Sequence, residues 1–326
     1  MRNEEYENLE FHSDLNYKLL GVFFFVGSVK SFCLALDMKF SAPTIVVKLG
    51  GASITKKSEF ETIDYDSLVK SATSLAAVIA KQPHNYIVVH GAGSYGHHQA
   101  KKFNLRGCFD SPPPPSSPSQ LPGVCATRLS VQKLNLLVVE ALINAGLKAV
   151  SISPMNLSVL CGEGTNSMAR MISLVTDCVV RGYVPVIHGD ACFTKAIPGA
   201  GIVSGDPMCE VLAKHFCKSN NPNDCAIFVT DVPGIFPKCP KKFQVDNELI
   251  REIIVDERGQ IVSKMNINTA LVDEYDVTGG ILSKIDSAVQ IARAGVPVHI
   301  VEGNTEELFR CASGEQFVGT TILRST

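Results

Sequence analysis

The chain has 326 residues, 45% of them hydrophobic and 19% charged, so it is long enough to bury a sizeable core in one large domain or two packed lobes. Its 30 Lys and Arg residues nearly balance its 32 Asp and Glu residues, and the net charge of -2 gives no reason to expect a nucleic-acid-binding or membrane-binding surface. Any anionic substrate must therefore be bound by local positive groups.

Residues 1–37 contain an apolar run that imitates a signal-peptide core or a membrane span. Its longest uncharged stretch, residues 19–29, is too short to cross a bilayer, and the segment before it is acidic rather than basic. Met38 stands just before the first predicted strand. We therefore expect residues 1–37 to be an extension outside the fold and residues 38–326 to form the domain; a cleaved targeting peptide is the alternative.

From Thr44 onward, short β-branched runs alternate with amphipathic segments. This pattern is typical of an α/β protein with an open, mostly parallel sheet sandwiched by helices. The predicted strands are residues 44–49, 86–90, 147–152, 184–188, 225–230, 296–301 and 317–323. The predicted helices, from their apolar periodicity, are residues 66–81, 124–145, 168–181, 205–217, 266–274, 281–294 and 304–312.

Two stretches do not fit this alternation. The proline-rich run at 108–123 is predicted to be a surface loop, because proline lacks an N–H donor and fixes φ, so it cannot join a helix or a central strand. The polar stretch at 237–259 predicts an irregular loop with a short strand or helix.

The 11 cysteines are scattered singly, and neither their odd number nor their spacing favours a disulfide framework or a structural zinc site. Cys178 and Cys225 lie inside apolar runs, where a free cysteine behaves as a small hydrophobic residue. We expect reduced thiols, a cytoplasmic location and no metal site built from side chains.

The stretch IVVKLGGASITKK, residues 45–57, leads from an apolar strand into Lys48, two glycines and two further lysines. Glycine has no side chain and tolerates unusual φ, so the backbone can approach a ligand closely, and Lys48 and main-chain amides would converge on an anion. A tight turn with solvated lysines is the alternative. The stretch is neither a Walker A loop nor a G-x-G-x-x-G dinucleotide turn.

The same arrangement recurs in YIVVHGAGSYGHHQA, residues 86–100, where a strand ends in His90 and opens into small residues. Ligands bind beyond the carboxyl ends of strands in an open α/β sheet, so both glycine-rich loops are expected to face one crevice. We interpret His97 as functional because it lies in a glycine-rich loop rather than on a helix face. We interpret His84 and His98 as structural.

Three further elements follow along the chain. After HGD and a predicted hairpin, SGDP opens a helix with Ser204 as its N-cap and Asp206 in its first turn, where capping alone could explain the aspartate. FVTDVPGIF, residues 228–236, is a strand followed by a turn. DVTGGILSKIDSA, residues 276–288, places glycines at a helix start and Lys284 one turn in, which would direct amides, the helix dipole and an ammonium at one phosphate.

Together, VVKLGGASIT, HGAGSYGHHQA, GD...IVSGD, TDVPGIF and DVTGGILSK resemble the amino acid kinase superfamily, and within it the isopentenyl phosphate kinases, to which the Gly-His-x-x-Ala run at 96–100 points. The resemblance covers roughly residues 44–324. The first 37 residues and the proline-rich run depart from the compact microbial pattern and resemble plant members. The resemblance implies transfer of the γ-phosphoryl group of ATP, with Mg²⁺, to isopentenyl phosphate in isoprenoid biosynthesis. Dimethylallyl phosphate is a second candidate substrate, and a homodimer is the candidate assembly.

The resemblance also implies roles for individual residues. Lys48 matches the lysine at the β- and γ-phosphates, Lys57 the transition-state lysine (with Lys56 as a one-residue alternative), and Asp206 the aspartate that organises the lysines by ion pairing. An apolar pocket for the isopentenyl tail is expected near Tyr95 and residues 124–160. The implied catalytic residues are Lys48, Lys57, His97, Asp206 and Lys284; the ATP-binding residues are Lys48, Gly50, Gly51, Ala52, Gly93, Asp231, Phe236, Gly279 and Lys284; the substrate-binding residues are Ala92, Gly93, His97 and Gly189.

Two other functions remain open. A kinase of the same superfamily could act on a carboxylate or a nucleoside monophosphate, although the pair Gly96 and His97 argues against a carboxylate. A regulatory protein that binds nucleotide without catalysis would be expected to have lost one of Lys48, Lys57 and Lys284, and all three are present.

The residue types agree with a kinase. Phosphoryl transfer needs in-line placement of the reacting groups and neutralisation of their charge, and lysines and backbone amides supply that neutralisation.

Overall fold

The computed structural model describes residues 42–82, 84–105, 120–155, 164–193, 200–219, 221–237, 248–263, 280–303 and 306–325. These residues belong to one compact unit, Ala42–Thr326. The predictions for residues 1–37 and for a helix at 266–274 lie outside the described residues, as does most of the proline-rich run.

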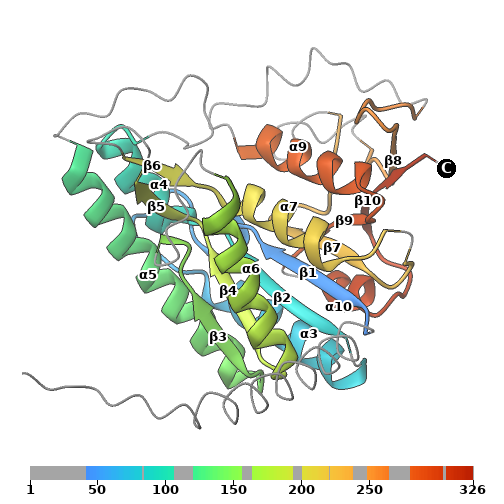
Figure 1. The fold of residues 1–326 in the computed structure, drawn as a ribbon, viewed down its shortest axis with the longest axis horizontal. Helices are drawn as coiled ribbons and strands as arrows, with labels where there is room; N and C mark the ends of the chain where they lie inside the picture. Colours follow the sequence, from blue (N-terminus) through green and yellow to red (C-terminus); the bar gives the residue numbers. More distant parts are fainter. Residues whose placement is uncertain are drawn as a thin grey trace, which may run out of the picture. The chain divides into compact units, whose positions relative to one another are not determined.

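In the described part of the chain, an eight-stranded sheet has the order β3-β4-β2-β1-β7-β9-β10-β8 (Figure 1). Neighbouring strands are parallel except β9 and β10. A separate antiparallel hairpin joins β5 and β6. The α/β class, the mostly parallel sheet and the hairpin are thus confirmed. The strands are β1 (Thr44–Leu49), β2 (Asn85–His90), β3 (Ala149–Ile152), β4 (Val184–His188), β5 (Asp190–Phe193), β6 (Ala200–Val203), β7 (Cys225–Thr230), β8 (Glu252–Val255), β9 (Val298–Glu302) and β10 (Gly319–Arg324).

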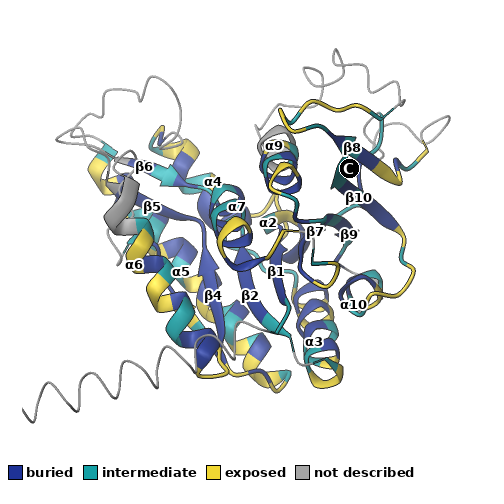
Figure 2. Ribbon diagram, turned by 45° about the vertical axis from the view of Figure 1, so that its right-hand side comes forward, coloured by how far each residue is buried: buried dark blue, intermediate teal, exposed yellow. Residues whose placement is uncertain are grey.

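Helices cover both faces of the sheet, so that its strands lie buried between two helical layers (Figures 1 and 2). One layer contains α3, α5 and α10, and the other contains α6, α7 and α9. Two helices, α2 and α4, directly follow β1 and β2. The helices are α2 (Gly51–Ile54), α3 (Tyr65–Lys81), α4 (Gly93–Lys102), α5 (Leu121–Asn144), α6 (Gly164–Val180), α7 (Gly205–Phe216), α9 (Gly280–Arg293) and α10 (Glu307–Ala312).

The central strand β1 is buried along its whole length, as expected for a parallel strand covered on both faces. Ile45, Val47 and Leu49 belong to the core cluster shared with α3, α5 and α10. Side chains alternate between the faces of a strand, so Val46 and Lys48 point toward the layer that contains α7. Lys48 is therefore a charged side chain inside an apolar layer.

Three sequence predictions need correction or completion. The glycine-rich segment after β2 is not a loop, because residues from Gly93 onward form α4. The proline-rich run ends earlier than predicted, since α5 begins at Leu121 and has Pro122 in its first turn, where the missing N–H costs no hydrogen bond. Within the polar stretch 237–259, the short element is the strand β8.

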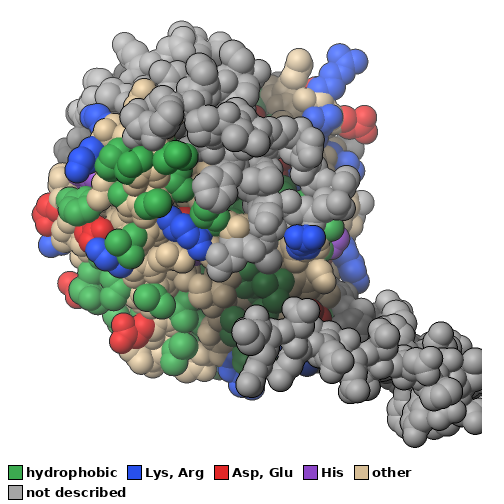
Figure 3. Space-filling model, turned by 60° about the vertical axis from the view of Figure 1, so that its left-hand side comes forward, with side chains coloured by type: hydrophobic (Ala, Val, Ile, Leu, Met, Phe, Trp, Pro, Cys, Tyr) green, Lys and Arg blue, Asp and Glu red, His purple; other side chains and the backbone are tan. Residues whose placement is uncertain are grey.

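The outer face of α5 carries a stripe of exposed apolar side chains. Leu129, Leu136 and Ile143 are 59%, 67% and 52% exposed and recur every seven residues, so they lie on one side of the helix. Hydrophobic side chains gather on this side of the molecule (Figure 3).

Cys178 and Cys225 are buried, as predicted, and every cysteine in the described segments is a free thiol. Of the helices described here, none combines the length and apolarity needed to cross a membrane.

Candidate active site

The carboxyl ends of β4, β2, β1 and β7, which are neighbours in the sheet, lie side by side, and together they form the edge where the candidate site lies. After each of three strands a glycine continues the hydrogen-bond ladder: Gly50 N donates to Val229 O (2.8 Å), Gly91 N to Leu49 O (2.9 Å) and Gly189 N to His90 O (3.1 Å). The chain runs from β1 toward β2 on one side and from β7 toward β9 on the other. The edge between β1 and β7 is therefore a topological switch point, where open α/β sheets bind ligands.

Two helix starts pack backbone to backbone beside this edge. A Cβ on Gly51 would lie 2.3 Å from Gly93 N, and a Cβ on Gly93, whose φ is +50°, would lie 2.3 Å from Thr55 Oγ1. The Thr55 hydroxyl donates to Gly51 O (2.7 Å) and accepts from Ser94 N (3.0 Å), which ties the two segments together. Both glycines are needed for this close approach between two backbone segments. The prediction that the KLGG turn approaches a ligand closely stays a prediction.

The start of α4 presents main-chain donors. Among the described residues, the N–H groups of Ala92 and Gly93 have no hydrogen-bond acceptor. The first amides of a helix have no partner within the helix, and they carry the positive end of its dipole. This helix start therefore suits an anion.

Lys48 and Asp206 form a buried ion pair across the edge, from Lys48 Nζ to Asp206 Oδ1. Lys48 is 4% exposed and Asp206 7%. Asp206 lies in the first turn of α7, where Ser204 caps the helix by accepting from Asp206 N (3.3 Å). The Lys48 ammonium also lies 5.5 Å from the centre of the Phe228 ring. Two residues 158 positions apart are thus brought together with their charges matched.

His97 lies on α4, so the prediction that it sits in a loop was wrong. Part of its side chain reaches solvent, and the surrounding protein shields the imidazole enough to affect its charge. Desolvation lowers the pKa of His97, and Lys57, His98 and Lys48 lower it further, whereas Asp206 raises it. The imidazole is therefore neutral at neutral pH and lies within electrostatic range of both lysines and of Asp206. A neutral imidazole still provides an N–H donor.

His98 fixes the position of the segment that carries Lys57. Its Nε2 donates to Lys57 O at 3.2 Å, and its ring packs edge-on against Phe60 at 6.0 Å. The interpretation of His98 as structural agrees with this contact to a main-chain oxygen. Through it, the Lys57 segment is held to the helix that carries His97.

The structure thus brings Lys48, Gly50, Gly51, Ala92, Gly93, Gly189 and Asp206 to one edge of the sheet, with Ala52 in α2 and His97 in α4. Asp231 and Phe236 follow β7 and are partly buried. Gly279 lies outside the described residues, and Lys284 is placed only as part of the α9 backbone.

Comparison with known proteins agrees with this geometry. The family model described as "Amino acid kinase family" matches residues 43–302. The chain belongs to the amino acid kinase family. It is 31% identical to isopentenyl phosphate kinase of Arabidopsis thaliana, over 85% of this chain and 94% of that protein, and 31% identical to isopentenyl phosphate kinase of Thermoplasma acidophilum, over 85% and 99%. A crystal structure of an isopentenyl phosphate kinase substrate complex superposes with a TM-score of 0.64 at 28% identity, covering 85% of this chain and 99% of the other.

This amino acid kinase also contains a buried polar cluster that the sequence did not reveal. His90 and His188 stack under the edge of the sheet, and Asp190 accepts from Arg128 (2.6 Å) and from Ser153 (3.0 Å). Burial and the neighbouring His188 lower the pKa of His90 to about 3, and burial raises the pKa of Asp190. The sequence signal that could have revealed this cluster is a histidine at the end of both β2 and β4, followed in each case by a glycine.

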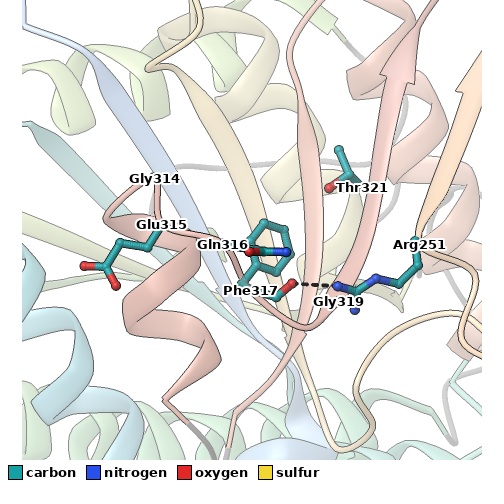
Figure 4. A pocket seen from close by; sticks show the side chains of 7 residues that line it. All are labelled: Arg251, Gly314, Glu315, Gln316, Phe317, Gly319 and Thr321. Atoms are coloured by element: carbon teal, nitrogen blue, oxygen red, sulfur yellow. Dashed lines mark hydrogen bonds between the residues drawn. The ribbon is translucent and has the colours of Figure 1, made fainter.

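A pocket beside β8 and β10 is separate from this site. Arg251 Nη2 donates to Phe317 O (3.0 Å) across it (Figure 4). None of the site residues lines it; its lining residues are Arg251, Gly314, Glu315, Gln316, Phe317, Gly319 and Thr321.

Proposed function

We propose that this amino acid kinase transfers the γ-phosphoryl group of ATP to isopentenyl phosphate and forms isopentenyl diphosphate and ADP. The observation that carries the proposal is the buried ion pair of Lys48 and Asp206, which lies at the switch point beside an unpaired helix start and His97. The relatives named isopentenyl phosphate kinase, matched over nearly their whole length, support the choice of acceptor.

The acceptor phosphate is assigned to the start of α4. The amides of Ala92 and Gly93, the His97 imidazole and the Gly189 backbone would hold its oxygens, because each is a neutral donor or a glycine that permits close approach. The acceptor oxygen is already ionised, so the reaction needs no strong general base. That oxygen bonds to the γ-phosphorus while the bond from this phosphorus to the β-phosphate oxygen breaks, and ADP leaves.

ATP is assigned to the side of β1 and β7. Lys48 and the turn at Gly50, Gly51 and Ala52 would contact its phosphates, with Lys57 neutralising charge on the moving group and Asp206 holding Lys48 in place. The remaining nucleotide-side residues are Gly93, Asp231, Phe236, Gly279 and Lys284.

Mg²⁺ fits this site as a companion of ATP. No three His, Cys, Asp or Glu side chains converge to hold a metal ion in the described segments. Mg²⁺ commonly binds through substrate phosphates, waters and few protein groups, and there it would neutralise charge on the β- and γ-phosphates.

The isopentenyl tail needs an apolar surface next to His97. A small apolar cluster lies one turn along α4, where Ala100, Val124 and Ala191 are buried with Met155 and Ile202 packed against them. We assign the tail to this cluster, which includes part of the predicted segment 124–160. Tyr95, the other part of that prediction, is buried in the main core.

We also propose a homodimer that packs α5 against α5 of a second copy. In an antiparallel pair centred on Leu136, Leu129 of each copy faces Ile143 of the other, so the exposed stripe is self-complementary. Sedimentation of the full chain tests this: a dimer that Leu136→Glu converts to a monomer is expected, and a wild-type monomer at micromolar concentration contradicts it.

We propose a cytoplasmic location for the protein. The free cysteines of the described segments support this proposal, because the cytosol keeps thiols reduced.

The assay that tests the function is ATP consumption with a panel of acceptors. Isopentenyl phosphate and dimethylallyl phosphate should be turned over, and UMP, glutamate and N-acetylglutamate should not. Faster consumption with a nucleoside monophosphate or a carboxylate would favour the alternative kinases, and no consumption with any acceptor would favour a non-catalytic protein.

A further inference from the structure

Strands β2 and β4 each end in a histidine that is followed by a glycine, and the two histidines have the same side-chain geometry. His90 Nδ1 lies 3.0 Å from the carbonyl oxygen of Gly91, and His188 Nδ1 lies 2.9 Å from that of Gly189. Both imidazoles are buried, and they stack with centroids 5.5 Å apart and planes 22° apart. Each ring is therefore held against the peptide that follows its strand.

The hydrogen bonds around His90 allow one tautomer. The Gly91 carbonyl can only accept, so Nδ1 of His90 must carry the proton, and Nε2 must accept. Asn135 Nδ2 lies 3.0 Å from that Nε2, and the other end of the amide, Oδ1, accepts from the Ser151 hydroxyl. Ser151, Asn135, His90 and Gly91 thus form one directional chain of hydrogen bonds, which runs from the exposed Ser151 hydroxyl through the buried side chains of Asn135 and His90 to the Gly91 carbonyl.

This chain fixes the peptide between Gly91 and Ala92. In a planar trans peptide the C=O and N–H groups point in opposite directions, so holding Gly91 O against His90 turns Ala92 N–H away from the core. That N–H has no acceptor among the described residues, and it stands at the N-cap of α4, near His97.

Without His90, this peptide could rotate. Position 91 must be glycine, because a Cβ there would lie 2.7 Å from Gly51 N, and glycine gives the adjoining peptide wide freedom of φ and ψ. A rotated peptide would turn a carbonyl oxygen toward the acceptor phosphate, where like charges repel.

We propose that His90, held in one tautomer by Asn135 and Ser151, is a positioning residue that directs the Ala92 N–H at the acceptor phosphate. The proposal rests on the proposed function. It assigns His90 no contact with substrate, so its effect should fall on the acceptor and not on ATP.

The test compares variants that keep or remove the donor. His90→Leu removes the donor. His90→Asn restores an N–H donor, because the amide nitrogen of asparagine is two bonds from Cβ, as Nδ1 is in histidine. Asn135→Leu removes only the partner that fixes the tautomer. His299→Leu is the matched control, because His299 is a partly buried histidine of β9 whose Nδ1 hydrogen-bonds to a side chain, Thr321 Oγ1 at 3.1 Å, and not to the backbone.

Steady-state kinetics are measured at a temperature at which every variant is folded. In His90→Leu, kcat/KM for isopentenyl phosphate should be about 10- to 100-fold lower than in wild type, and the KM for ATP should stay within about twofold of wild type. His90→Asn should recover most of the loss, and Asn135→Leu should raise the acceptor KM by about fivefold or more. His299→Leu should lower thermal stability and leave both KM values unchanged.

Three results would overturn the proposal: wild-type kinetics in His90→Leu, equal losses for ATP and acceptor, or His90→Asn no better than His90→Leu. If His90→Leu does not fold, an unchanged acceptor KM in Asn135→Leu overturns it. Wild-type turnover is measured first with the acceptor panel. A different preferred acceptor would refute the proposed substrate, and the same variants tested with that acceptor would still decide the role of His90.

Discussion

Breaking the Lys48–Asp206 ion pair from one side should cost far more stability than breaking a surface ion pair. The two side chains are only 5% and 10% exposed, so Lys48→Met leaves a carboxylate with little water around it. At an ordinary charge-assisted separation of about 2.8 Å and an effective dielectric constant of about 20, the attraction is about 6 kcal/mol. Desolvation of the two ions offsets part of this, and the expected loss in each single variant is about 3–5 kcal/mol.

A double-mutant cycle measures the pair directly. Lys48→Met combined with Asp206→Leu leaves no buried charge, so the double variant should be nearly as stable as wild type, and the coupling energy should be at least about 3 kcal/mol. The matched control is the pair Lys214–Glu210 on α7, with an Nζ–Oε1 distance of 2.6 Å and side chains 36% and 23% exposed. Its coupling should be about 0.5 kcal/mol or less.

Urea unfolding at pH 7, followed by circular dichroism, gives the free energies of unfolding for both cycles. A coupling for the buried pair below about 1 kcal/mol, no larger than that of the surface pair, would refute the reasoning. The double variant should regain stability and still lose at least about a hundredfold in kcat, because the charge directed at phosphate is gone. Recovery of kcat together with stability would show that Lys48 has only a structural role.

The remaining predictions concern single positions. Gly93→Ala, with φ +50° and a clash at 2.3 Å, should cost at least about 2 kcal/mol more in urea unfolding than Gly146→Ala, which has φ +95° and nothing within 4 Å; equal costs would contradict the close packing. His97→Ala should lower kcat/KM for isopentenyl phosphate by about 30- to 900-fold and His98→Ala by less than about tenfold; the reverse order would mean that His98 faces the acceptor. Burial lowers the pKa of His299 to about 4, so wild type should lose stability as the pH falls from about 6.5 toward 4. Between about pH 7.5 and pH 5, the free energy of unfolding of His299→Leu should fall by about 2 kcal/mol less than that of wild type, and parallel stability curves would contradict a lowered pKa of His299 in the folded protein.

Strands β1, β2 and β4 were predictable because each is a short apolar run followed by a glycine, at Gly50, Gly91 and Gly189. Helix α4 was missed because glycine at positions 93 and 96 lowers local helix propensity. Packing decides the outcome there, since a Cβ on Gly96 would lie 2.4 Å from Ala92 Cβ and 3.0 Å from Val131 Cγ1. Close contact between α4 and α5 favours the helix and requires this glycine.

The sequence singled out Lys48 and Asp206 from separate motifs, and the resemblance suggested that the aspartate pairs with lysines. The particular contact between them depends on strand order, because α7 returns across the sheet to pack on β1. The chain of hydrogen bonds through His90 depends on tertiary structure in the same way. Its members come from β2, α5 and β3, and no local pattern connects them.

The most direct test of the proposed function is ³¹P NMR of the purified chain with ATP, Mg²⁺ and isopentenyl phosphate. The account predicts that the acceptor monophosphate signal is replaced by the two coupled signals of isopentenyl diphosphate, in step with formation of ADP. In competition, N-acetylglutamate and UMP should be phosphorylated at least about a hundredfold less efficiently. ATP consumed with an unchanged isopentenyl phosphate signal, or faster phosphorylation of either competitor, would contradict it.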